Sequence, residues 1–88
     1  MSKVKIEQAL NEAFDPVYLN VIDDSAKHAG HAGAREGGHY SVEIVSAAFN
    51  GKKSLERHRM VYAAVVPIKN LIHALAIKAK TPEEAHSE

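Results

Sequence analysis

Two hydrophobic periods alternate along this 88-residue chain, and their order constrains the fold more than any other feature of the sequence. Apolar residues recur at helical spacing over residues 3–14, and a second helical stripe starts at Ser54 and ends at Pro67. The second helix is expected to bury four residues: Leu55, Val61, Tyr62 and Val65. Three further segments alternate apolar and polar residues as strands do: 17–22, 40–45 and 72–78.

Two shorter helical pieces complete the order. Residues 46–51 end in Asn-Gly and predict a helical turn before a tight bend, after which Ser54 is expected to cap the next helix. Thr81 begins a helix-start pattern, but we expect one terminal turn at most and a disordered tail at 85–88. The order helix, strand, strand, helix, helix, strand predicts an α+β, two-layer domain over residues 1–88, with a three-stranded sheet.

The segment between the first two strands, residues 23–38, differs in composition from the rest of the chain. It holds four of the five glycines, two aspartates, His28 and His31, and no large apolar residue. This composition predicts a long flexible loop. We expect the two strands that it joins to pair antiparallel. Loops of this length in compact domains are commonly either functional or disordered.

Charge is balanced overall but not along the sequence. Eleven basic and eleven acidic residues cancel, which argues against nucleic-acid binding through net charge alone. Residues 51–80, however, contain seven basic side chains and Glu56 as the one acid. The basic residues of this segment predict a surface for DNA phosphates or an acidic partner, and simple solvation is the alternative. The candidate residues of this surface are Lys52, Lys53, Arg57 and Arg59.

Histidine is the chain's main source of metal ligands. There is no cysteine, so the chain cannot hold an iron–sulfur cluster by its own thiolates, but there are six histidines. His28 and His31 have a spacing that can serve a metal, but the spacing alone is weak evidence and favours two solvated loop histidines. His73 interrupts an apolar strand and is either functional or bonded to the strand backbone. We assign no role to His39, at the start of the second strand.

Motifs for catalysis and membrane insertion are missing from the sequence. It contains no Gly-x-Ser-x-Gly, no phosphate-binding glycine loop and no His-Glu-x-x-His. No apolar run approaches the roughly 18–20 residues that span a membrane, and residues 1–4 lead directly into a helical pattern. We therefore expect a soluble, cytoplasmic protein that is not an enzyme and is monomeric in isolation.

Several sequence blocks, taken together, resemble the BolA family. They cover nearly the whole chain in the expected order: Phe49-Asn-Gly51, Arg57 to Tyr62, Ile72-His73-Ala74-Leu75 and Thr81-Pro82-Glu83. The resemblance implies a class II KH-like fold, which agrees with the order of elements read from periodicity. It also implies a protein that is not an enzyme.

The resemblance implies two kinds of function. Family members pair with monothiol glutaredoxins and act in the assembly, trafficking or sensing of [2Fe–2S] clusters, and bacterial members are linked to DNA binding and control of stress and morphology genes. In the first role His73 matches a cluster ligand, and His28 or His31 matches the second. A glutaredoxin thiolate and glutathione would supply the sulfur ligands, so this chain would bind no cluster alone.

Overall fold

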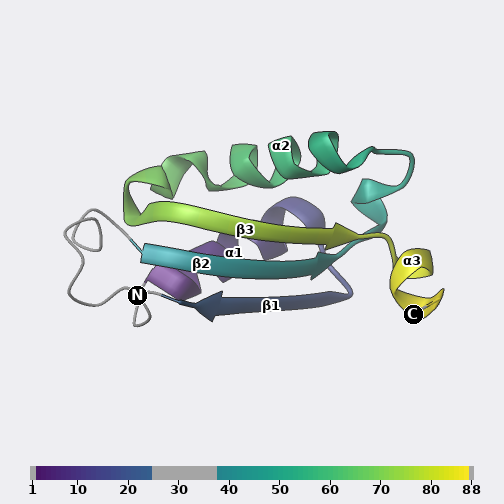
Figure 1. The fold of residues 1–88 in the computed structure, drawn as a ribbon, viewed down its shortest axis with the longest axis horizontal. Helices are drawn as coiled ribbons and strands as arrows, with labels where there is room; N and C mark the ends of the chain where they lie inside the picture. The colour runs from purple at the N-terminus through teal and green to yellow at the C-terminus, as the bar shows by residue number, and fades with distance from the viewer. Residues whose placement is uncertain (1, 25–37, 88) are drawn as a thin grey trace.

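The structure is a computed structural model that describes residues 2–24 and 38–87. Its three strands form one sheet in the order β1-β2-β3 (Figure 1): β1 Tyr18–Asp23, β2 Gly38–Val45 and β3 Ile72–Lys80. β1 and β2 pair antiparallel, as predicted, whereas β2 and β3 pair parallel. A parallel pair requires a crossover connection, and the helical segment between β2 and β3 provides it. The α+β fold with a three-stranded sheet is confirmed.

In the described part of the chain, five helical segments accompany the sheet: α1 Ser2–Phe14, η3 Ala47–Phe49, α2 Ser54–Val65, η4 Val66–Leu71 and α3 Pro82–Ser87. Figure 1 shows that α2 runs back along the sheet while α3 lies beyond the end of β3. Lys53, rather than Ser54, is the cap of α2, and its backbone N–H donates to the Glu56 carboxylate at 3.2 Å. The α-helix stops before Pro67, as predicted. A 3₁₀ segment continues through Pro67, because the N–H that proline lacks would have no helical partner in a first turn.

The core lies between the sheet and the two long helices. α1 buries Ile6, Leu10 and Phe14, and the Phe14 ring meets the Phe49 ring at a centroid distance of 5.1 Å. From α2, Val61 and Val65 are buried. The prediction that the other two residues of its stripe are also buried is wrong: Leu55 is 61% and Tyr62 is 48% exposed.

The two segments predicted to lack regular structure have different outcomes. Of the predicted loop 23–38, residues 25–37 lie outside the described residues, while Asp23 ends β1 and Gly38 begins β2. Of the predicted tail 85–88, residues 85–87 continue α3 instead. The Thr81 hydroxyl accepts from the Glu84 N–H at 3.1 Å, and the Glu84 carboxylate accepts from the Thr81 N–H at 2.9 Å. This reciprocal cap stabilises the start of the short helix.

Candidate functional site

His73 lies at the start of β3, where the pairing with β2 is irregular. Gly38 is the Cα partner of Ile72, but the next residue, His39, is the partner of Ala74. His73 is therefore an extra residue in the edge strand, and such bulges re-aim side chains. His73 does not share the face of Leu75 and Ile77, which its spacing in the strand would predict: Leu75 is buried in the core and Ile77 packs against it, whereas His73 is exposed.

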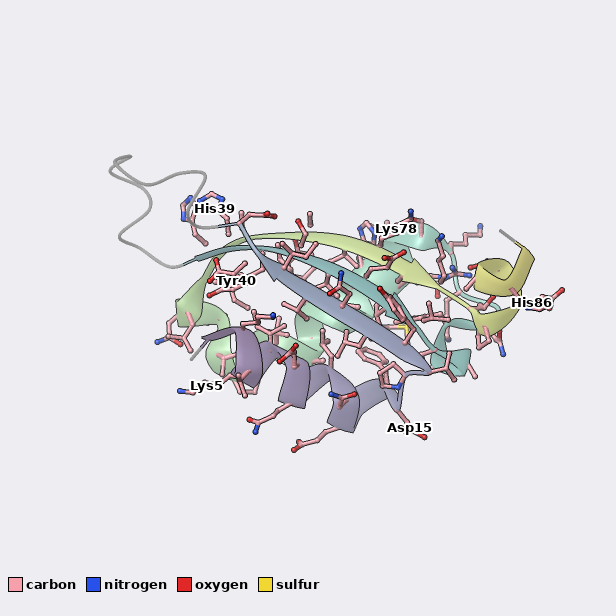
Figure 2. All side chains as sticks on the ribbon, turned by 90° about the horizontal axis from the view of Figure 1, so that it is seen from below. Lys5, Asp15, His39, Tyr40, Lys78 and His86 are labelled. Carbon is pink, nitrogen blue, oxygen red and sulfur yellow. The ribbon has the colours of Figure 1, made fainter. Side chains whose placement is uncertain are left out.

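The bulge brings His73 beside His39, to which the sequence assigned no role. The two imidazole centroids are 4.9 Å apart and the rings are inclined by 50°. Figure 2 shows His39 on the side of the sheet away from α1, and Tyr40 on the opposite side. No spacing in the sequence could have indicated this pair, because 33 residues separate its members and the bulge determines their approach.

The loop histidines His28 and His31 lie outside the described residues. Both ends of the segment that carries them are described, however, and both are at the His73 end of the sheet. The Asp24 N–H donates to the His39 carbonyl at 2.7 Å, and Gly38 pairs with Ile72. The described residues that flank this segment, Asp24 and Gly38, therefore lie at the same end of the sheet as the His39–His73 pair.

An apolar hollow adjoins the pair between α2 and the edge strand. Its lining includes Tyr62, Val66, Ile72 and His73. The Tyr62 hydroxyl donates to the Leu75 carbonyl at 3.0 Å, so it satisfies an acceptor on the outer edge of β3. Exposed apolar side chains that rim a polar group are typical of a surface that packs against another molecule.

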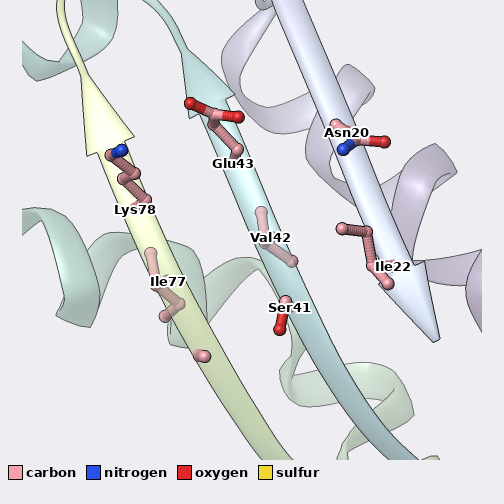
Figure 3. A pocket seen from close by; sticks show the side chains of 8 residues that line it. Asn20, Ile22, Ser41, Val42, Glu43, Ile77 and Lys78 are labelled. Atoms are coloured by element: carbon pink, nitrogen blue, oxygen red, sulfur yellow. The ribbon is translucent and has the colours of Figure 1, made fainter. Parts of the chain in front are cut away.

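A second hollow lies on the open face of the sheet, which no helix in the described part of the chain covers (Figure 3). It is shallow and crosses all three strands, with Asn20, Ser41, Glu43 and Lys78 as its polar lining residues. Glu43 and Lys78 are Cα partners on neighbouring strands. One carboxylate beside one ammonium is a poor donor set for a metal, so the histidine pair is the stronger candidate.

The predicted basic residues lie at the other end of the sheet, and one of them is already engaged. Arg57 donates to the carbonyls of Lys52 and Ala79 at 2.8 and 3.1 Å, and its guanidinium forms two bonds with the Glu84 carboxylate. The bonds from Arg57, together with that from the Thr81 N–H, lower the pKa of Glu84 to about 2. The bond to the Glu84 carboxylate in turn raises the pKa of Arg57. Lys52, Lys53 and Arg59 are exposed.

The histidine pair and the basic residues are therefore separate sites. Arg57 contacts Ala79, which follows His73 by six positions on the same strand. A strand rises about 3.3 Å per residue, so the two sites lie about 20 Å apart. Within residues 2–24 and 38–87, no three acidic or histidine side chains converge as a metal site.

Comparison with known proteins identifies the family. The profile of the BolA-like protein family matches residues 10–84. The chain belongs to this family. It is 39% identical over 85 residues to the DNA-binding transcriptional regulator BolA of Escherichia coli, covering 96% of this chain and 79% of that protein. It is also 42% identical to SufE-like protein 1, chloroplastic/mitochondrial, of Arabidopsis thaliana, of which it spans only 24%.

Solved BolA-like structures share the fold. The BolA domain of SufE1 from Arabidopsis thaliana superposes with a TM-score of 0.82 at 44% identity, covering 94% of each chain. A Bol-like protein from Babesia bovis gives a TM-score of 0.84 at 33% identity, covering 99% of this chain and 92% of that one. Across the described residues, helices are too short or too polar to cross a membrane. The cytoplasmic location stays a prediction.

Proposed function

We propose that this BolA-like chain is a non-enzymatic adaptor that shares a [2Fe–2S] cluster with a monothiol glutaredoxin. The observation that carries the proposal is the placement of His73: an exposed imidazole in the bulge of an edge strand, with a second imidazole at 4.9 Å. A side chain buried beneath the sheet could not reach a ligand held by another protein. His73 does not have that obstacle.

The donor set of this chain fits one half of such a cluster. Without cysteine it offers only imidazoles, and two histidines are accepted ligands for one iron of a [2Fe–2S] unit. Such a cluster supplies electron transfer or a transferable iron–sulfur unit when bound. His73 would contribute one ligand, His28 or His31 the second, and the glutaredoxin and glutathione the sulfur atoms.

The surroundings of His73 suit a site completed by a second protein. The hollow formed by Tyr62, Val66 and Ile72 presents apolar surface beside the imidazole, and a glutaredoxin that packs there would remove water from the metal ligands. The segment that carries the loop histidines starts and ends at this same end of the sheet. A single docking surface could therefore contact all the proposed ligands.

Reconstitution with a monothiol glutaredoxin tests this proposal. The two proteins would be mixed with iron, sulfide and glutathione, and visible circular dichroism would be compared with that of the glutaredoxin alone. We expect a new spectrum that His73→Ala abolishes and that His58→Ala, a matched control on α2, leaves intact. An identical spectrum from wild type and His73→Ala would exclude His73 as a ligand.

A DNA-binding regulator is the second candidate, favoured by the name of the Escherichia coli relative and by the exposed Lys52, Lys53 and Arg59. Arg57 contributes little to such a surface because its guanidinium is paired with Glu84. Phosphate contacts release counterions, so binding would weaken steeply as salt rises. We expect Lys53→Glu and Arg59→Glu to weaken it, and His73→Ala to leave it unchanged. Binding that is independent of salt would exclude this role.

A further inference from the structure

We propose that His39 and His73 together chelate a single divalent transition-metal ion in this chain by itself, without a partner protein, sulfide or glutathione. The site consists of two imidazoles on adjacent strands, with water completing the coordination. It differs from the shared cluster in its ion, in its second ligand and in needing no other protein. The inference stands on the ring geometry and the strand register of the described residues.

The separation of the rings fits two ligands on one ion. An imidazole nitrogen binds such an ion at about 2.0–2.1 Å, and the ring centre lies about 1.1 Å beyond the nitrogen. Two imidazoles that meet one ion at about 90–109° therefore have ring centres roughly 4.5–5.2 Å apart. The observed separation of 4.9 Å lies inside this range.

The backbone places the two histidines side by side before any ion arrives. His39 is anchored in the central strand, where its carbonyl accepts from the Asp24 N–H and its Cα pairs with Ala74. His73 is positioned by the bulge, and its neighbour Ile72 packs against the core. Ligands on strands need little ordering when the ion binds, so less conformational entropy is lost than with loop ligands.

The ligand type specifies the class of ion. Neutral imidazole suits Zn²⁺, Cu²⁺ and Ni²⁺, whereas Mg²⁺ and Ca²⁺ prefer oxygen ligands. Affinity should follow the general order for nitrogen sites, with Cu²⁺ above Ni²⁺ and Ni²⁺ above Co²⁺. His73 is exposed and His39 is half-buried.

This site would regulate the proposed function. The regulation rests on the shared cluster, whereas the binding of the ion does not. An ion bound between His39 and His73 occupies the imidazole that the cluster requires. Loading the isolated chain with Zn²⁺ would then compete with formation of the glutaredoxin complex. The binding of the ion itself depends on no such complex.

The test is titration of the isolated full chain with Zn²⁺ and Ni²⁺, followed by calorimetry and by imidazole ¹⁵N chemical shifts. We expect one ion per chain, with the signals of His39 and His73 shifting together. His39→Ala and His73→Ala should each weaken binding by more than about tenfold. The matched controls are His58→Ala, His86→Ala and the double variant His28→Ala/His31→Ala, all of which should bind like wild type.

Each other outcome contradicts the inference. Unchanged affinity in His39→Ala, or loss of binding only in the double loop variant, would place the ion elsewhere. A chemical-shift change confined to one of the two imidazoles would show that they do not act as a pair. This measurement uses wild-type protein, so it does not depend on the folding of a variant. Because glutaredoxin, iron and sulfide are absent, failure here leaves the cluster proposal standing, and failure of the reconstitution leaves this inference standing.

Discussion

The guanidinium of Arg57 donates two hydrogen bonds to the carboxylate of Glu84, at 2.7 and 3.0 Å, across 27 residues of sequence. The same guanidinium donates to the Ala79 carbonyl at the end of β3. One side chain of α2 therefore holds both the last strand and the helix that follows it. The Arg57–Glu84 pair adds to the Thr81–Glu84 cap at the start of α3.

Loss of Arg57 should destabilise the fold. Arg57→Ala leaves the carbonyls of Lys52 and Ala79 without this donor and leaves the Glu84 carboxylate without its ion pair, so we expect unfolding to become easier by about 1–2 kcal/mol. Urea denaturation at pH 7 measures this change. The exposed Arg59→Ala is the control and should stay within about 0.5 kcal/mol of wild type. Equal stability of the two variants would contradict the role assigned to Arg57.

Stability should fall in acid through Glu84. Its pKa is about 2 in the folded chain and near its ordinary value of 4.5 in the unfolded chain, so its contribution is complete above about pH 4.5. The contribution is lost as pH falls from about 4.5 to 2. We expect the stability difference between wild type and Glu84→Gln to shrink over this window. An NMR titration of the Glu84 carboxyl with a midpoint near 4.5 would contradict this.

A buried hydroxyl links the end of α1 to η3. Ser46 is 1% exposed; its Oγ donates to the Phe14 carbonyl at 2.6 Å and accepts from the Ala48 N–H at 3.1 Å. Ser46→Ala removes the hydroxyl and leaves the Phe14 carbonyl and the Ala48 N–H without this partner, and we expect a loss of about 2 kcal/mol in urea denaturation. The exposed Ser54→Ala is the control. A loss below about 0.5 kcal/mol would show that water replaces the hydroxyl.

Gly38 should not tolerate a side chain. A Cβ at this position would lie 2.5 Å from the ring of Tyr40, which is only 5% exposed and cannot move freely. We expect Gly38→Ala to destabilise the chain by about 1–3 kcal/mol, as measured by thermal and urea unfolding. In a Tyr40→Leu background the same substitution should cost less, because the atoms in conflict are gone. Equal cost in both backgrounds would point to the backbone instead.

Periodicity predicted the order of the elements because buried faces impose it on the sequence. Tyr40, Val42 and Ile44 alternate in sequence and are all buried in β2. It failed on α2, where Leu55 and Tyr62 are apolar but exposed. Hydrophobicity alone does not specify which of two apolar stripes on a helix meets the sheet.

The candidate site was less predictable than the fold. His73 could be identified because the block around it resembles a family motif. Its contact with His39, however, depends on a one-residue bulge that no local sequence pattern predicts. Arg57 was predicted as a surface cation because its partner Glu84 lies far along the chain. Both results come from tertiary contacts, which single-sequence reasoning does not provide.

The lengthwise separation of His73 from Lys52, Lys53 and Arg59 has a steric consequence. A protein that binds over the imidazoles covers one end of the sheet. It leaves the two lysines and the arginine at the other end exposed to solvent. Two macromolecules could therefore occupy the domain simultaneously in a ternary assembly, with β3 as the rigid spacer between them. In such an assembly the domain would be a bivalent connector.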